Sequence, residues 1–257
     1  MTLGEAFQLN DREVISLLGG GGKTTLMFSW GRELANRRRG VILTTTTKIR
    51  EPEPSPDYVS LVSSDFTRMQ EWIVKNLPKH PCLLLAQSSL PAGKWEGLPA
   101  GWIEEIMKIP AVTCILVEAD GAKGYSLKAP REGEPVVPSN TTLLVPVVGI
   151  DALGCPLDEK HVFRWRLAME ILQKPEGAIL DEEMIARILA ATLKERPERT
   201  RVIPFVNKID SPNDLERGRK LGRALFQIPG QEIRRVVLGQ AQKAPFVKEV
   251  ISRNLNP

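Results

Sequence analysis

Residues 19–25 read Gly-Gly-Gly-Gly-Lys-Thr-Thr, a composition that is typical of a loop that binds phosphate. Glycine allows successive backbone N–H groups to turn toward an anion, and the N-terminus of a following helix adds positive potential. Lys23 supplies a mobile positive charge, and the hydroxyl of Thr24 can bind magnesium. The residues that we predict to bind the triphosphate of ATP or GTP, together with Mg²⁺, are Gly20, Gly21, Gly22, Lys23, Thr24 and Thr25.

This loop departs from the common phosphate-loop pattern at one position. The pattern Gly-x-x-x-x-Gly-Lys has its first glycine at position 17, which is Leu17 here, so only the shorter form from Gly19 to Thr24 is present. The alternative is a glycine-rich turn between a strand and a helix that binds no ligand. We favour phosphate binding, because a run of glycines costs conformational entropy that close approach to a ligand would explain.

Two acids follow the apolar run at 112–117, which predicts a buried strand. Acids at the end of such a strand, next to a phosphate loop, are the expected partners of its magnesium. We predict that Asp120 and Thr24 bind Mg²⁺ directly or through water, and that Glu118 positions a water or a second ligand. Lys23, Glu118 and Asp120 are our candidate catalytic residues. The alternative is a turn that uses Asp120 and Gly121 for their backbone preferences.

Hydroxyls and cations follow the strand predicted at 41–43, where residues 44–48 read Thr-Thr-Thr-Thr-Lys. In an open parallel sheet, ligands bind at the carboxyl ends of the strands. We predict that Thr46 or Thr47 senses the γ-phosphate, in a loop that closes on the triphosphate state. The cations that we expect to serve this switch, or to reach an anionic second substrate or a partner, are Lys48, Lys123, Lys128 and Arg131.

Residues 207–210 read Asn-Lys-Ile-Asp and follow a late strand predicted at 202–206. At this place in nucleotide switches such a turn recognises guanine, with Asp210 accepting from the base, Asn207 contacting its edge and Lys208 covering the ring. The same four residues are also common turn formers, so a turn without a ligand is an equal alternative.

The elements that must position these residues alternate between strand and helix. This order predicts an α/β fold, with a three-layer arrangement of a mainly parallel sheet and helices on both faces, as in P-loop NTPases. We expect one nucleotide-binding domain over 1–257, with 120–165 as a possible substrate or partner loop region. The predicted strands are 14–18, 41–43, 58–62, 82–86, 112–117, 142–148 and 202–206, and the predicted helices include 24–38, 65–77, 102–108, one that carries Phe163, Leu167 and Ile171, and 181–195.

Composition limits the classes of partner. The 35 Lys and Arg against 31 Asp and Glu give a net charge of only +4, which is not the charge pattern of a nucleic-acid surface. No apolar run is long enough to span a membrane, so we expect a cytoplasmic protein that binds neither membrane nor nucleic acid. Cys82 and Cys114 lie in apolar runs as expected for core residues, whereas Cys155 lies in a loop and its role stays open.

Taken together, six motifs resemble those of the YqeC family, and they cover residues 14–210. The motifs are Gly-Gly-Gly-Gly-Lys-Thr-Thr-Leu (19–26), Thr-Thr-Thr-Thr-Lys-Ile (44–49), Val-Glu-Ala-Asp-Gly-Ala-Lys-Gly (117–124), Leu-Lys-Ala-Pro (127–130), Val-Gly-Ile-Asp-Ala-Leu-Gly (148–154) and Asn-Lys-Ile-Asp (207–210). Tyr125 departs from the basic or small residue that is usual there. The resemblance implies a P-loop nucleotide-binding protein that acts as an accessory factor for selenium-dependent molybdenum hydroxylases, without defining a reaction.

Three functions follow from these residues. The first is a Mg²⁺-dependent NTP-binding protein, a slow hydrolase of the phosphoanhydride bond, that matures a client molybdenum hydroxylase or acts with its cofactor-maturation proteins. The second is a small-molecule kinase or ATP-dependent ligase that uses the same loop, because Lys123, Lys128 and Arg131 are able to clamp an anionic acceptor. The third is a nucleotide-binding regulator that does not hydrolyse its ligand.

Overall fold

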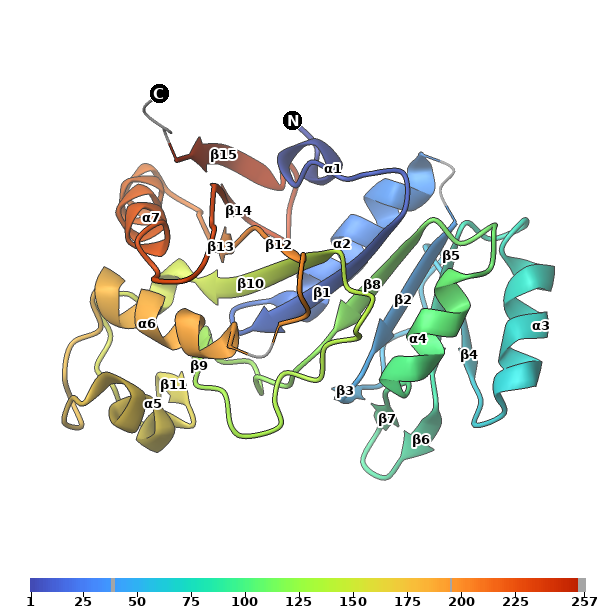
Figure 1. The fold of residues 1–257 in the computed structure, drawn as a ribbon, viewed down its shortest axis with the longest axis horizontal. Coiled ribbons are helices and arrows are strands. Elements are labelled where there is room, and N and C mark those ends of the chain that lie inside the picture. The colour runs from blue at the N-terminus through green and yellow to red at the C-terminus, as the bar shows by residue number, and fades with distance from the viewer. Residues whose placement is uncertain (38–39, 195, 254–257) are drawn as a thin grey trace.

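The structure, a computed structural model, describes residues 1–37, 40–194 and 196–253. Its centre is a sheet with the strand order β4-β5-β2-β8-β1-β10-β13-β14-β15, and β12 also pairs with β10 (Figure 1). Neighbours in this order are parallel, except that β15 is antiparallel to β14. The strands are β1 (Glu13–Gly19), β2 (Val41–Thr45), β4 (Val59–Val62), β5 (Cys82–Ala86), β8 (Cys114–Glu118), β10 (Leu143–Gly149), β12 (Arg201–Val202), β13 (Phe205–Asn207), β14 (Arg235–Gly239) and β15 (Val247–Ser252).

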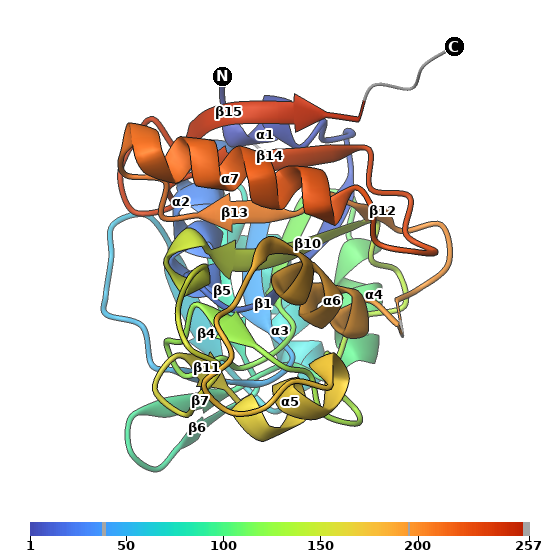
Figure 2. The ribbon, with the colours of Figure 1, turned by 90° about the vertical axis from the view of Figure 1, so that its left-hand side faces the viewer.

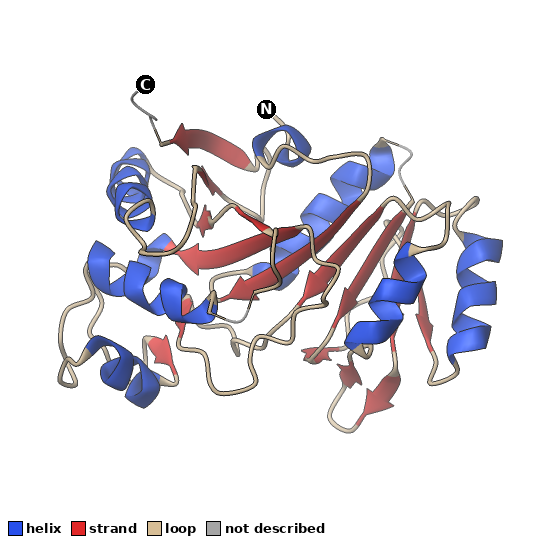
Figure 3. Ribbon diagram, in the orientation of Figure 1, coloured by secondary structure: helices blue, strands red, loops and turns tan. Residues whose placement is uncertain are grey.

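Helices cover both faces of this sheet (Figures 1 and 3). Helices α1 (Leu3–Ala6) and α2 (Lys23–Asn36) pack on one face, where their apolar side chains share a core with alternate residues of β1, β2 and β8. The opposite face is covered by α3 (Phe66–Asn76), α4 (Ala100–Met107), α6 (Glu182–Thr192) and α7 (Pro212–Leu225). The predicted three-layer α/β fold is therefore confirmed. No helix in the described part of the chain is long and apolar enough to cross a membrane.

Strand β1 lies in the middle of the sheet and is buried on both faces. Ile15 and Leu17 pack against α2, whereas Val14 and Leu18 belong to the cores on the opposite face. This is why the sequence shows a continuous apolar run here rather than an alternation of apolar and polar residues. Strand β1 therefore holds the start of the glycine loop in a fixed place.

Two small sheets lie beside the central one and were not predicted. One has the order β3-β7-β6, with β3 (Lys48–Arg50), β6 (Ser88–Leu90) and β7 (Lys94–Glu96), and the other pairs β9 (Leu127–Lys128) with β11 (Val162–Phe163). In Figure 2, β11, α5 (Trp165–Leu172), β6 and β7 all lie at the end of the molecule away from β15. These strands have two or three residues each, so their periodicity in the sequence is too short to detect.

Several predicted boundaries were wrong. Phe163 belongs to β11, and α5 begins only at Trp165. The strand predicted at 202–206 is divided into β12 and β13 around Pro204, which lacks the N–H that a continuous ladder requires. The region 120–165, a possible substrate or partner loop region, contains β10, which agrees with the strand predicted at 142–148. The predicted ends of two helices, Arg38 and Glu195, lie outside the described residues.

The pairing register brings the ends of the central strands together. Glu118 of β8 is level with Leu17 of β1 on one side and with Thr45 of β2 on the other. On the other side of β1, Gly19 of β1 is level with Val147 of β10, and Gly149 of β10 is level with Asn207 of β13. The loops after β1, β2, β8, β10 and β13 therefore leave the sheet at one edge, where ligands bind in open parallel sheets.

Candidate functional site

The glycine loop connects β1 to α2 and is packed tightly against three neighbouring segments. A Cβ on Gly21, whose φ is +80°, would lie 2.2 Å from the backbone nitrogen of Gly149. A Cβ on Gly22, whose φ is +112°, would lie 2.5 Å from Nδ2 of Asn207. Only glycine combines these backbone angles with such close contacts. The loop and the helix after it therefore have the strand–loop–helix arrangement of a phosphate-binding loop.

The backbone N–H groups of this loop divide into two sets. Those of Gly20 and Gly21 donate to carbonyl oxygens of Val147 and Tyr125, at 2.9 and 2.7 Å, and so support the loop instead of facing a ligand. Among the described residues, the N–H groups of Lys23, Thr24 and Thr25 in the first turn of α2 have no acceptor. The N-terminus of α2 therefore offers free donors to an anion, whereas the predicted contact through Gly20 and Gly21 stays a prediction.

Lys23 lies between the loop and two carboxylates. Its Nζ donates to the carbonyl oxygen of Gly19 at 2.7 Å and lies 3.2 Å from Asp120 Oδ1 and 3.7 Å from Glu118 Oε1. All three charged side chains are buried. The ammonium group therefore stands within the site and is neutralised by acids until an anion competes for it.

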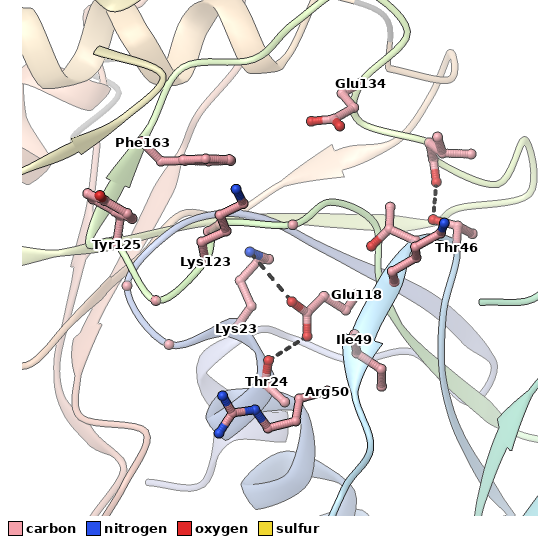
Figure 4. Close-up of a pocket in the computed structure, with 18 of the residues that line it drawn as sticks. Lys23, Thr24, Thr46, Ile49, Arg50, Glu118, Lys123, Tyr125, Glu134 and Phe163 are labelled. Atoms are coloured by element: carbon pink, nitrogen blue, oxygen red, sulfur yellow. Dashed lines mark hydrogen bonds and ion pairs between the residues drawn. The ribbon is translucent and has the colours of Figure 1, made fainter. Parts of the chain in front are cut away.

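Glu118 contacts Thr24 as well as Lys23 (Figure 4). The Thr24 hydroxyl donates to Glu118 Oε2 at 2.6 Å. Burial raises the pKa of Glu118, and the nearby Lys23 ammonium and the Thr24 hydrogen bond oppose that rise. Because burial disfavours an uncompensated carboxylate charge, a second cation beside Glu118 and the Thr24 hydroxyl would stabilise this group.

Asp120 is held by protein groups on both oxygens. Its Oδ2 accepts from the N–H of Gly19 at 3.0 Å and from Nζ of Lys128 at 2.7 Å, and its Oδ1 faces Lys23. The side chain is completely buried, so it does not reach the cavity. Glu118 is the carboxylate that contacts Thr24, and binding of magnesium by Asp120 and Thr24, directly or through water, stays a prediction.

A chain of charges continues from Asp120 away from the loop, through the buried Lys128 to the half-buried Glu134 and Arg164. Lys128 donates to Asp120 and, at 2.8 Å, to Glu134 Oε2, while Arg164 binds both oxygens of Glu134 at 2.7 and 2.9 Å. Burial raises the pKa of Glu134, but hydrogen bonds from Arg164 and Lys128 outweigh it and lower the pKa to about 2. Lys128 is buried and fully engaged, so it supports Asp120 and does not reach the second substrate that we predicted for it.

The residues present fit a magnesium ion at Thr24 and Glu118. Mg²⁺ is commonly held by one or two protein oxygens together with waters and substrate phosphates, so a closed set of protein ligands is not required. A hydroxyl and a carboxylate oxygen 2.6 Å apart, beside the anion-binding turn of α2, supply such oxygens. Thr24 and Glu118 are therefore the side chains that would hold the ion.

The threonines after β2 lie along the same edge. The Thr46 N–H donates to the carbonyl oxygen of Glu118 at 3.1 Å, and the Thr46 hydroxyl donates to the carbonyl oxygen of Val136 at 2.6 Å. The Thr47 hydroxyl lies 3.3 Å from that of Thr45. Both Thr46 and Thr47 line the cavity that adjoins α2, so a role in sensing a ligand stays a prediction.

One large cavity, of about 1310 Å³, connects these features. Its described walls carry eight cationic side chains and only three carboxylates, so its electrostatics favour an anionic ligand. Lys123 lies on one wall with its Nζ 5.3 Å from the Phe163 ring centre, and Figure 4 shows it across the site from Arg50. Cavity residues that the sequence analysis missed are Arg50, Lys94, Glu134, Phe163 and Arg164.

The sequence gives only weak signals for these missed residues. Arg50 follows Lys48 at a spacing of two, which in a strand places both on one face, but the strand has only three residues. Glu134 and Arg164 lie in irregular segments 30 residues apart, so only the folded chain brings them together.

The turn at 207–210 is close to the loop, but two of its residues are engaged by protein groups. Asn207 donates from Nδ2 to the carbonyl oxygen of Gly21 at 2.6 Å and accepts from the Ala241 N–H at 2.8 Å. Lys208 donates to Ser126 Oγ at 2.6 Å and to Asp151 Oδ2 at 2.7 Å. Asn207 thus supports the loop, Asp210 is exposed, and base recognition stays a prediction.

A second cavity, of about 340 Å³, adjoins the first and shares Lys123, Tyr125 and Lys208 with it. Cys155 lies in its wall, 3.1 Å from the carbonyl oxygen of Asp151. Burial and the Asp151 carboxylate raise the pKa of this thiol, which favours an unreactive, protonated cysteine.

Comparison with known proteins places the chain in a sequence family. A family model described as YqeC protein matches residues 15–166, more than half of the chain. The uncharacterized protein YqeC of Escherichia coli (strain K12) is 26% identical over 249 residues, which cover 91% of this chain and 90% of that protein.

Two crystal structures of FtsY from Mycoplasma mycoides align with 98% and 97% of this chain and with 67% of their own chains. Their identities are 10% and 8% and their TM-scores are 0.31 and 0.33. A likeness this weak carries no argument, so the fold assignment rests on the strand order and pairing.

The substitution Glu134→Gln tests the buried charge chain. Because its folded pKa of about 2 lies below the ordinary 4.5, the ionised carboxylate stabilises the fold above about pH 4.5, and that contribution is lost as the pH falls toward 2. We expect the variant to melt below the wild type near neutral pH, and the difference to shrink in acid. Thermal unfolding over this pH range measures both.

Glu132→Gln is the matched control, since Glu132 lies exposed in the same loop and should leave the melting temperature unchanged at every pH. A difference between Glu134→Gln and wild type that is absent near neutral pH, or independent of pH, would contradict the role given to Glu134.

Proposed function

Because the chain belongs to the YqeC family, we propose that it is a Mg²⁺-dependent NTP-binding protein, a slow nucleoside triphosphatase that matures a selenium-dependent molybdenum hydroxylase. The family membership confirms the resemblance inferred from the motifs. The maturation role is the role implied by that resemblance. The nucleotide site is supported by the geometry of this chain.

One observation carries the nucleotide proposal. The N-terminus of α2, with its unpaired N–H groups, meets the Lys23 ammonium and the Thr24–Glu118 pair at the wall of one cationic cavity. Helix N-termini bind phosphate through such N–H groups and through the helix dipole. A lysine and a hydroxyl–carboxylate pair next to them are the groups that a magnesium triphosphate requires.

Positioning and charge neutralisation provide the chemistry. In the proposed complex, the N–H groups of Lys23, Thr24 and Thr25 donate to the phosphates, and the Lys23 ammonium moves from its carboxylates to the phosphate oxygens. Magnesium, when bound at Thr24 and Glu118, neutralises charge on the phosphates. Thr46, beside Glu118, orients the attacking water or closes over the γ-phosphate. Phosphoryl transfer depends mainly on such positioning and electrostatics, so these residues are sufficient in kind.

A second candidate function is a small-molecule kinase or an ATP-dependent ligase. The observation that favours it is the number of cations on the cavity walls beyond those next to the loop, including Lys48 and Lys123. Such side chains would bind an anionic acceptor. Both candidates use the same nucleotide site, so they differ in what stimulates turnover.

Lys23→Ala tests the nucleotide site. We expect it to weaken binding of the magnesium triphosphate by at least about tenfold, because a charge-assisted hydrogen bond is worth about 1.5–3 kcal/mol. Isothermal titration with ATP, GTP and CTP measures the affinity. Lys79→Ala, at an exposed site that follows α3 and does not line the cavity, is the control and should bind as the wild type does.

The lost lysine leaves two carboxylates without their partner, so a second variant guards against misfolding. Thr24→Val removes only a hydroxyl from an exposed position and should reduce the gain in affinity that magnesium provides. Unchanged affinity in both variants would remove the nucleotide site from α2.

Asp210→Asn tests base recognition. If the carboxylate accepts hydrogen bonds from guanine, we expect the variant to lose GTP affinity by about tenfold and to keep ATP affinity, which serves as the internal control. Competition binding with the two nucleotides measures the ratio. Equal losses, or none, would reduce residues 207–210 to a structural turn.

Turnover separates the candidate functions. We expect slow phosphate release by the protein alone and an increase of at least about tenfold when a molybdenum-free form of the selenium-dependent hydroxylase is added, since a client would complete the catalytic arrangement. Phosphate release with Lys23→Ala gives the background. Stimulation by small anionic acceptors but not by the hydroxylase would favour a kinase or ligase. Nucleotide binding without release under any condition would favour a regulator.

A further inference from the structure

The small sheet β3-β7-β6 forms a wall of the large cavity and has two different faces. Strands β3 and β7 are antiparallel, with Lys48 level with Glu96, Ile49 with Trp95, and Arg50 with Lys94. Ile49 and Trp95 are buried in the core beside α2. Because side chains alternate between the faces of a strand, the charged residues share the opposite face, and all four line the cavity.

This face contains an uncompensated pair of like charges. Arg50 and Lys94 are directly opposite each other, a position in which Cβ atoms are about 4.5–5.5 Å apart and like charges destabilise a sheet. Neither side chain forms an ion pair with a carboxylate in the described part of the chain, and Glu96, the carboxylate on the same face, is level with Lys48 instead. An anion between Arg50 and Lys94 would remove their repulsion.

The cavity has room for such an anion in addition to a nucleotide. Its volume of about 1310 Å³ exceeds the roughly 300–1,000 Å³ that is typical of sites for one small molecule. The phosphates of a nucleotide already have Lys23 and the first turn of α2. Figure 4 shows Arg50 extending from β3 into the same space that Thr24 and Glu118 face.

We propose that Arg50 and Lys94 bind the anionic group, a phosphate or a carboxylate, of a small second substrate that enters the cavity beside the nucleotide. The inference rests on the nucleotide site of the proposed function and on its second candidate, a kinase or ligase, because it names the chemical class of the acceptor that would bind beside the nucleotide. Two cations on a rigid pair of strands favour an oxyanion that accepts from both, and the arginine fork adds bidentate geometry.

The test uses inorganic pyrophosphate and citrate as probes for the phosphate and carboxylate forms of the ligand. Isothermal titration is performed on the wild type, on Arg50→Gln/Lys94→Gln, and on Lys23→Ala, in which the phosphate loop is impaired. We expect pyrophosphate or citrate to bind Lys23→Ala. When Arg50→Gln and Lys94→Gln are added to Lys23→Ala, we expect the affinity for that probe to fall by at least about tenfold. The probe whose affinity falls shows whether the second substrate carries a phosphate or a carboxylate.

Lys75→Gln/Lys79→Gln is the matched control, because both lysines are exposed on or just after α3 and neither lines the cavity. It should leave the affinity of both probes unchanged.

Without any ligand, Lys94→Gln should raise the melting temperature by up to about 4 °C, because it removes the like-charge pair, and pyrophosphate or citrate should stabilise it less than the wild type. This measurement does not depend on the double variant.

The outcomes separate this inference from the nucleotide proposal. Equal affinity of both probes for Lys23→Ala with and without the double substitution would overturn the anion site. In Arg50→Gln/Lys94→Gln, a loss of affinity for the nucleoside triphosphate without a loss for the nucleoside diphosphate would also overturn the anion site. Arg50 and Lys94 would then contact the γ-phosphate. Failure of the nucleotide proposal appears elsewhere, as unchanged triphosphate affinity in both Lys23→Ala and Thr24→Val.

Discussion

The buried carboxylate of Asp120 is the constraint on which the rest of the site depends. It has no contact with solvent, and such a charge is tolerated only if opposite charges and hydrogen-bond donors surround it. The Gly19 N–H, Lys23 and Lys128 meet this requirement, and they come from the end of β1, from α2 and from β9. Removal of any one of them would leave charge uncompensated, so the carboxylate fixes all three segments relative to one another.

Compensation then extends outward, because Lys128 is also buried and requires a second acid. Glu134 supplies that acid, and Arg164 in turn binds both of its oxygens. The irregular segment at 129–136 and the residue before α5 are therefore connected electrostatically to the phosphate loop. Negative charge arriving over α2 would compete with Asp120 and Glu118 for Lys23, so occupation of the loop and the balance of this buried chain are coupled.

The sequence predicted the parts of this arrangement that depend on local pattern. Strands β1, β5, β8 and β10 are long apolar runs, and α2 has a stripe of buried residues at helical spacing, so their types and order were clear. The ion pair between Asp120 and Lys128 could not be predicted, because Lys128 and its second partner, Glu134, belong to a segment without periodicity. Arg50 and Lys94 were missed for a related reason, since only the pairing of two three-residue strands places them opposite each other.

The absence of glycine at position 17 also has a physical explanation. Leu17 is still part of β1, where it is completely buried in the core beside α2, so the loop begins only after Gly19. A shorter loop has less backbone with which to surround an anion, and the N–H groups of Gly20 and Gly21 are used to attach it to β10 and to residue 125. The first turn of α2 must then provide the backbone donors for a phosphate, and the Lys23 ammonium at the start of this helix must provide the positive charge.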